Sequence, residues 1–82
     1  MSEYIFDYSK LLGKIKEVCK TQAAFARKMG MSLSGLSARL HNKQDFDAKE
    51  ICLACEILHI AFVDIPIYFF TRIVQKHEPI NA

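Results

Sequence analysis

The chain has 82 residues, of which 51% are hydrophobic and 24% are charged, and its formal net charge is +2. This length predicts a single domain of modest stability. No apolar run reaches about 18 residues, which argues against a membrane-spanning helix, and the N-terminus lacks the pattern of a secretory signal. We therefore expect one domain over residues 1–76, a disordered end over residues 77–82, and an intracellular protein.

Charge is distributed unevenly along the chain. The segment from Lys10 to Lys43 holds eight basic residues against a single acid, Glu17, for a local net charge of +7, whereas the remainder carries −5. A local excess of positive charge is typical of a surface that binds a polyanion such as nucleic acid. A solvated helix face is the alternative interpretation.

The first predicted helix follows Asp7, which can cap it, and ends near Cys19, while residues 1–6 are expected to be frayed. Gly13 lies inside this helix, where it costs about 1 kcal/mol relative to alanine, and close packing is one reason for a glycine there. Apolar residues recur at i, i+3, i+4, i+7 spacing and predict one buried stripe: Tyr8, Leu11, Leu12, Ile15, Val18 and Cys19.

The segment 21–43 predicts two short helices joined by a glycine turn. Thr21 and Ser32 are good N-cap residues, and Gly30 suits a left-handed turn between the helices. The core side chains expected from this pair are Phe25, Ala26, Met29, Leu36 and Leu40. Two helices with this spacing are typical of a helix-turn-helix, whose second helix can enter the major groove of DNA.

A fourth helix is predicted to run from Asp47 to about Leu58. Asn42 suits a left-handed position after the preceding helix, Phe46 is expected to pack inward, and the spacing of Asp47 and Glu50 is that of a capping box. The buried face expected of this helix consists of Ile51, Cys52, Ala54, Cys55 and Leu58.

The three cysteines are an odd number in a chain without an export signal, which predicts reduced thiols. Cys52 and Cys55 have the CxxC spacing of a metal or redox site, but no second pair completes a set of four ligands. The sequence contains no P-loop, dinucleotide-binding turn or serine nucleophile motif, and His41, His59 and His77 lack partners at catalytic spacing. We expect no metal site, no cofactor and no enzyme activity.

The last quarter of the chain is rich in aromatic residues. Residues 61–64 can form one helical turn, Pro66 can begin another, and residues 69–74 have the composition of an extended strand. Two roles are open for the aromatic cluster, a dimer surface or closure of the core. The residues concerned are Tyr68, Phe69, Phe70 and Ile73.

These elements resemble the lambda-repressor-like and Cro-type regulators of phages over roughly residues 6–72. The matching residues are Gln22, Ala26, Met29, Gly30, Met31, Ser32 and Leu36. The resemblance implies an all-α fold of five helices, with a helix-turn-helix formed by the second and third helices and a short extended C-terminal tail. It further implies a sequence-specific repressor of phage or prophage origin, acting in the cytoplasm of the bacterial host as a homodimer on a double-stranded DNA operator.

On this hypothesis the third helix reads DNA with its N-terminal turn and outer face. The expected base contacts are Ser32, Leu33, Ser34, Ser37 and Ala38. The expected phosphate contacts are Gln22, Arg27, Lys28, Arg39 and Lys43. A stray surface leucine is the alternative interpretation of Leu33.

The second hypothesis is a protein-interaction module. The predicted recognition helix is poor in arginine, asparagine and glutamine at its first positions, where base-reading side chains usually lie. An outward Leu33 and an aromatic C-terminal segment suit an antirepressor or co-repressor. Such a protein binds a partner repressor and changes the occupancy of that repressor on DNA.

Overall fold

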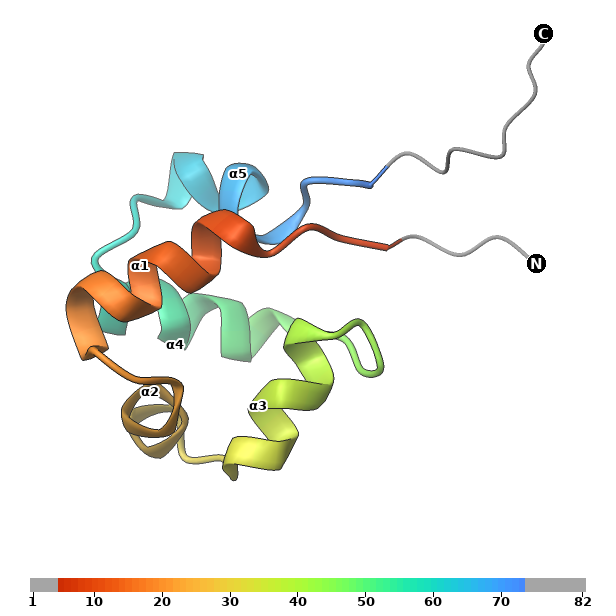
Figure 1. Cartoon of the computed structure of the whole chain (residues 1–82). Helices are drawn as coiled ribbons and strands as arrows, with labels where there is room; N and C mark the ends of the chain where they lie inside the picture. The colour runs from red at the N-terminus through yellow and green to blue at the C-terminus, as the bar shows by residue number, and fades with distance from the viewer. Residues whose placement is uncertain (1–4, 74–82) are drawn as a thin grey trace, which may run out of the picture.

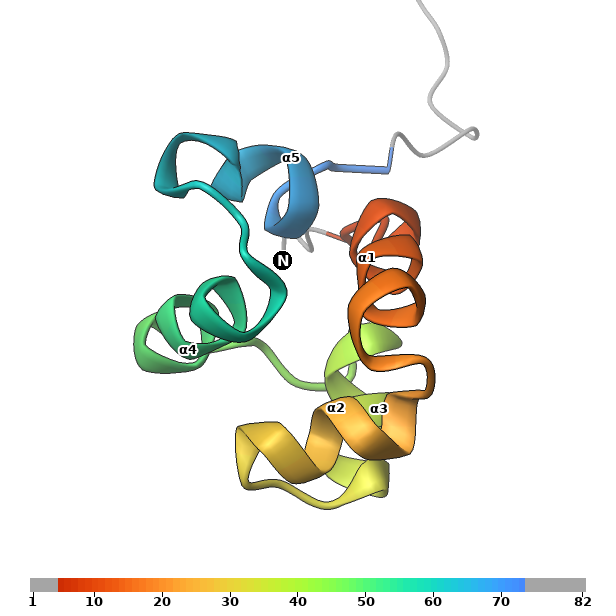
Figure 2. The same cartoon turned by 90° about the vertical axis from the view of Figure 1, so that its left-hand side faces the viewer.

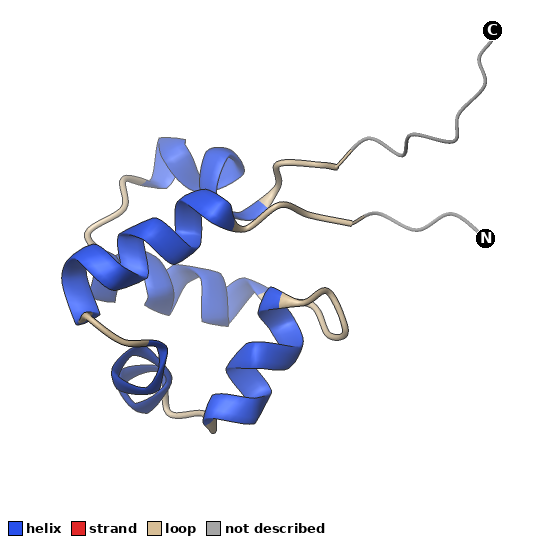
Figure 3. Ribbon diagram, viewed as in Figure 1, coloured by secondary structure: helices blue, strands red, loops and turns tan. Residues whose placement is uncertain are grey.

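Five α-helices enclose a single apolar core (Figure 1). The structure is a computed structural model and describes residues 5–73. In chain order the elements are α1 (Ser9–Cys19), α2 (Gln22–Met29), α3 (Leu33–Leu40), α4 (Ala48–Leu58), the 3-10 helix η1 (Phe62–Asp64) and α5 (Ile65–Phe69). Figure 3 shows helices and loops, without a β-strand, throughout this described part. The predicted all-α architecture of five helices is confirmed.

Side-chain caps define where three of the helices begin, as the sequence predicts. Thr21 and Ser32 each accept a hydrogen bond at 3.0 Å from the backbone N–H three residues further on. Asp47 and Glu50 form the expected reciprocal capping box at the start of α4. Each cap of this kind stabilises its helix by about 1 kcal/mol because it satisfies a backbone donor that has no partner inside the helix.

Left-handed residues end or follow four of the helices. Gly30 has a φ of 75° after α2, and Asn42 has a φ of 63° after α3, both as predicted. Lys20 and His59 also adopt positive φ values, 75° and 59°, after α1 and α4. A left-handed conformation costs a residue with a Cβ about 1 kcal/mol.

The core lies where all five helices meet, with α1 and α4 on opposite sides, α5 above and the α2–α3 pair below (Figure 2). Helix α1 contacts α2, α4 and α5, and α2 contacts α3 and α4. The largest fully buried side chains are Phe25, Phe69, Leu11, Ile15, Leu36 and Leu58. Each contributes about 1.5–3 kcal/mol through the apolar surface that it removes from water.

A chain of aromatic rings runs from the surface into this core. The ring of Phe70 lies 5.7 Å from that of Phe6, and Phe6 lies 6.3 Å from Tyr8. Tyr8 lies 5.5 Å from Phe46, which in turn lies 5.3 Å from Phe69. Three of the four pairs are edge-to-face, the geometry that the ring quadrupoles favour.

The segment before α1 is held in place, contrary to the predicted fraying at Phe6. The side chain of Asn42 clamps the peptide groups of this residue: Phe6 N–H donates to Oδ1 at 2.9 Å, and Nδ2 donates to Phe6 O at 2.9 Å. Phe6 also forms an isolated antiparallel bridge with Arg72, next to a hydrogen bond of 2.7 Å from Asp7 N–H to Thr71 O. The predicted extended segment therefore begins after Phe69, which is still helical.

The prediction that Cys52 is buried is wrong. Helix α4 turns Ile51, Ala54, Cys55 and Leu58 into the core at i, i+3, i+4, i+7 spacing. Cys52 follows Ile51 by one residue, which rotates its side chain by about 100° and places it in solvent. The other two cysteines are buried, as predicted.

Two expectations concern the ends of the chain and the membrane. The proposed disorder of residues 77–82, and the end of the domain at residue 76, lie outside the described residues. Among residues 5–73 no single helix is long and apolar enough to cross a membrane. Helix α4 and the η1–α5 segment pass that test only as a pair, and they are bent by 118° relative to each other.

Candidate protein interface

Large exposed apolar side chains are concentrated along the chain in η1, α5 and the residues that follow. Among the described residues nine large hydrophobic side chains are exposed, and five of them lie between positions 62 and 73. We call these five the α5 apolar surface: Phe62, Val63, Ile67, Phe70 and Ile73. Phe62 and Val63 are 79% and 80% exposed. Single exposed apolar side chains are ordinary, but five within residues 62–73 are not, so this surface is the strongest candidate for an interface.

The local fold explains why these side chains face outward. Phe69 is 1% exposed and closes the core, which anchors the inner side of α5. Tyr68 is half-buried, with Lys14 Nζ 6.0 Å from its ring centre. Phe70 and Ile73 remain exposed. Of the two roles left open for this aromatic cluster, closure of the core falls to Phe69, and a dimer contact by the exposed Phe70 and Ile73 stays a prediction.

The residues predicted to contact bases lie on α3 and at its cap. Ser32, Leu33 and Ser34 are exposed, and Leu33 points outward with 49% of its surface accessible, as expected. Ser37 and Ala38 are half-buried. A hollow of about 380 Å³ on this face is lined by Ser34, Ser37, Ala38, His41 and Lys43. The structure brings Ser34, Ser37 and Ala38 together around this hollow, and contact of the five residues with DNA stays a prediction.

Four of the residues predicted to contact phosphate are exposed: Gln22, Arg27, Lys28 and Lys43. Gln22 lies at the start of α2 beside Lys16 and Lys20 of the α1 end, and together they border a hollow of about 290 Å³. These positions are compatible with an anionic ligand. Their role likewise stays a prediction.

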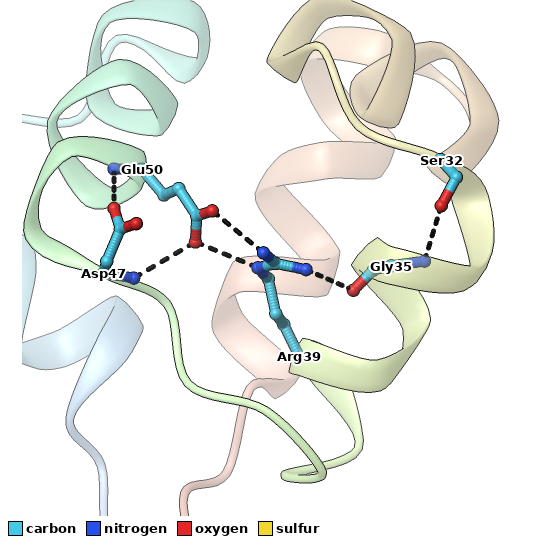
Figure 4. A network of polar contacts seen from close by, with 5 residues as sticks. All are labelled: Ser32, Gly35, Arg39, Asp47 and Glu50. Atoms are coloured by element: carbon cyan, nitrogen blue, oxygen red, sulfur yellow. Dashed lines mark hydrogen bonds and ion pairs between the residues drawn. The ribbon is translucent and has the colours of Figure 1, made fainter.

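Arg39 differs from the other four because the structure ties it to α4 (Figure 4). Its Nε and Nη2 donate to the two carboxylate oxygens of Glu50, each at 2.9 Å, and Nη1 donates to Gly35 O at 2.8 Å. The side chain of Arg39 is 11% exposed. The guanidinium of Arg39 is thus engaged in a bidentate ion pair with Glu50, and its phosphate contact stays a prediction.

The same contact changes the titration of Glu50. Hydrogen bonds from Arg39 lower the pKa of Glu50 below its ordinary value of 4.5, against a smaller opposing effect of burial. Glu50 also accepts a hydrogen bond of 3.1 Å from Asp47 N–H and so completes the capping box. The carboxylate of Glu50 therefore caps the N-terminus of α4 and also links α4 to α3 through Arg39.

Chemical groups suited to metal binding are not assembled in this part of the molecule. Within residues 5–73 no group of three or more histidine, cysteine, aspartate or glutamate side chains could hold a metal ion. Cys55 and Cys52 do not share a surface, since the first is buried and the second exposed. Burial raises the pKa of the Cys55 thiol, which keeps it protonated.

The two most exposed members of the α5 apolar surface, Phe62 and Val63, were not predicted as site residues. The sequence placed them only in a helical turn over residues 61–64. A signal was present, because a short connection between helices usually carries polar or turn-forming residues, and here it carries a phenylalanine followed by a valine.

Comparison with known proteins identifies relatives of this chain. A family model described as "Protein of unknown function (DUF739)" matches residues 4–72. Among solved structures, the chain is similar to the modulator of repression (MOR) of the temperate bacteriophage TP901-1 from Lactococcus lactis. The two are 46% identical, with a TM-score of 0.72, over 79% of this chain and 88% of that one. No curated protein sequence matches the chain.

These findings correct the expected membership in the lambda-repressor-like and Cro-type regulators. The family model that matches is that of DUF739, and the similar solved structure is a modulator of repression rather than a DNA-binding Cro-like repressor. The assignment as a Cro-like repressor is therefore wrong. The second hypothesis, a modulator that works through another protein, agrees better with the comparison.

Proposed function

This chain belongs to the DUF739 family, and from that premise we propose that it is a modulator that binds a partner repressor protein and changes the occupancy of that repressor on DNA. The observation that carries the proposal is the likeness to a phage modulator of repression at 46% identity. The proposal places the protein in the cytoplasm of a bacterial host, and it requires neither a catalytic step nor a cofactor.

The α5 apolar surface is the proposed contact with the repressor. Phe62 and Val63 expose about four fifths of their surface on the short helix η1, and Ile67 and Phe70, in and directly after α5, are half-exposed. Removing such side chains from water contributes about 25 cal/mol per Å² of apolar area. Aromatic residues at the centre of a contact usually carry much of its binding free energy. A repressor face with apolar side chains is thus the complementary partner.

The α2–α3 pair is proposed to be a helix-turn-helix in geometry. The caps at Thr21 and Ser32, and the left-handed Gly30 between the two helices, support this assignment. The outer face of α3 presents serines, an alanine and Leu33 in place of long base-reading side chains. In the proposed function this face is a secondary surface, and its DNA contacts are not required.

The proposal is tested with the repressor encoded in the same phage region and a labelled operator fragment. Repressor binding to the operator is measured by fluorescence anisotropy, with and without this protein. We expect this protein to change the apparent repressor affinity at least ten-fold, and not to shift the operator by itself at the same concentration. Binding to the operator alone, with the repressor unaffected, would contradict the proposal.

A matched pair of variants locates the surface. Phe62→Ser with Val63→Ser is expected to weaken binding to the repressor by ten-fold or more, since each lost anchor costs about 1–2 kcal/mol. Leu33→Ser on α3 removes a comparable exposed side chain, 49% accessible, and serves as the control that retains binding. If Leu33→Ser weakened repressor binding and the Phe62→Ser, Val63→Ser variant did not, the repressor contact would lie on α3 instead.

A further inference from the structure

Helix α4 carries an exposed stripe that no other element of the described chain covers. Its members occur at i, i+3, i+4 and i+7: Lys49, Cys52, Leu53 and Glu56. With Ala48 they line an open hollow of about 340 Å³ whose surface is mostly apolar. Helix α4 packs on α1, α2 and α5 through its other side. The stripe is therefore exposed to solvent, and Figure 2 shows α4 itself at the edge of the fold.

The stripe is complementary to itself. Lys49 precedes Cys52 by three residues, and Glu56 follows Leu53 by three residues. Rotating α4 by 180° about the midpoint between positions 52 and 53 therefore exchanges the basic end with the acidic end. Self-complementarity of this kind is what an isologous two-fold interface requires.

The two charges are placed against the preference of an isolated helix. Lys49 lies in the first turn of α4, where the helix dipole favours an anion, and Glu56 lies in the last turn, where it favours a cation. Neither residue takes part in an ion pair among residues 5–73. The stability of α4 alone therefore does not account for either charge.

We infer that α4 pairs in antiparallel fashion with α4 of a second copy of this chain. In that arrangement Lys49 faces Glu56 of the second copy, at the end of that helix where a cation is favoured, and the reciprocal contact forms as well. Cys52 and Leu53 of both copies form the apolar centre. This surface is separate from the α5 apolar surface and from the predicted dimer contact at residues 68–73, so the inference stands independently of the proposed function.

The expected dimer is weak. Helix α4 has 11 residues and is about 16 Å long, and one helix pair of that length covers less than the roughly 1,200 Å² that a stable interface buries in total. Two copies would exchange rapidly and pair mainly at high protein concentration. Detection therefore requires a method that traps the pair.

Cys52 supplies that method, because it lies next to the two-fold axis while Cys19 and Cys55 are buried. The folded protein is treated with a short bis-maleimide at high concentration, and the covalent dimer is quantified by denaturing gel and mass spectrometry. Cys52→Ser should abolish the dimer. Lys49→Glu and Glu56→Lys should each lower its yield about five-fold or more, because each reversal opposes like charges at two symmetric positions.

The double variant Lys49→Glu with Glu56→Lys decides the question, since it again places opposite charges face to face. Recovery of the wild-type yield supports the antiparallel pair. Single variants that cross-link as well as the wild type, or a double variant that does not recover, would overturn it. Loss of folding is excluded by thermal unfolding, because each reversal agrees with the helix dipole and should leave the monomer as stable or more stable.

Discussion

Gly13 and Gly30 have different roles in this chain, and the structure shows how these roles differ. Gly30 has a φ of +75°, which a residue with a side chain adopts only at a cost. Gly13 lies on the exposed side of α1, and among residues 5–73 no atom beyond its chain neighbours and the adjacent α1 backbone lies within 4 Å of the position that a Cβ would occupy. The close packing considered for Gly13 from the sequence is therefore absent, and its only local effect is the entropy that it costs α1.

Gly13→Ala is accordingly expected to stabilise the protein by about 1 kcal/mol, because alanine restricts the unfolded chain and adds no clash. Gly30→Ala is the matched control and should destabilise by about 1 kcal/mol, since alanine resists a left-handed conformation. Urea unfolding at equilibrium measures both changes. A destabilised Gly13→Ala variant would mean that α1 has an unrecognised neighbour at this position.

At the scale of elements, α3 is fastened to the rest of the molecule by a polar contact as well as by its apolar side. Leu36 and Leu40 are buried, and Arg39 reaches across to the carboxylate of Glu50 on α4. The geometry is bidentate and the two side chains are 11% and 21% exposed. A contact this well shielded from water contributes more than an ordinary surface ion pair.

Glu50→Gln is expected to destabilise the fold by about 2 kcal/mol at pH 7, because it removes a charge-assisted contact with Arg39. The folded-state pKa of Glu50 is lowered, so its contribution is complete above the ordinary value of 4.5 and disappears as the pH falls through the lower folded value. The difference between variant and wild type should therefore shrink towards pH 3.

The free energy of unfolding, measured in denaturant at pH 7 and pH 3, checks this expectation. Glu17→Gln is the control, since Glu17 pairs with Lys14 at 3.6 Å but is 69% exposed, and its loss should change the stability by less than about 0.5 kcal/mol. Equal effects of the two variants, or a Glu50→Gln effect that persists at pH 3, would contradict the proposed role of the ion pair.

The helices could be predicted from the sequence because their determinants are local. Thr21, Ser32 and the Asp47–Glu50 pair act within three residues of themselves. Cys52 is wrongly predicted to be buried because it is adjacent to the buried Ile51. An apolar residue next to a buried position fits the helical spacing of buried residues almost as well as the buried residue itself. The ion pair of Arg39 could not be predicted, because both an ion pair and a phosphate contact require only an accessible arginine.

At the scale of the whole molecule, contacts between distant segments organise the candidate interface. The side chain of Asn42, at the end of α3, hydrogen-bonds to both the backbone N–H and the backbone C=O of Phe6. Phe6 in turn forms the β-bridge with Arg72 and contacts the ring of Phe70. Thus α3 is connected to the α5 apolar surface by way of the segment before α1. No local pattern in the sequence indicates this connection, because its partners are 36 or more residues apart.

Asn42→Gly is expected to destabilise the fold by about 1–2 kcal/mol, because it removes two hydrogen bonds while keeping a residue suited to a φ of 63°. Within the proposed function it should also weaken repressor binding, through loss of order around Phe70. His59→Gly changes another left-handed residue, which is exposed, and should instead be neutral or stabilising. Denaturant unfolding and repressor titration of both variants provide the measurement.

The function could be predicted only as one of two alternatives. Caps, a glycine turn and inward leucines specify how α2 and α3 pack, and a repressor or a protein that acts on a repressor can use the same packing. The comparison with a phage modulator of repression distinguishes the alternatives, and the two most exposed residues of the proposed contact surface lie in a short turn that the sequence did not mark as a site.

The chain of rings that joins Phe70 to Tyr8 through Phe6 also gives the protein an optical property. The sequence contains three tyrosines and no tryptophan, so tyrosine dominates its near-ultraviolet emission. Phe70 lies two ring contacts away from Tyr8, so a ligand bound on Phe70 would alter the surroundings of this chain of rings. A tryptophan in that ligand would accept excitation energy from Tyr8. Tyrosine emission of the unlabelled protein is therefore expected to change when the α5 apolar surface is occupied.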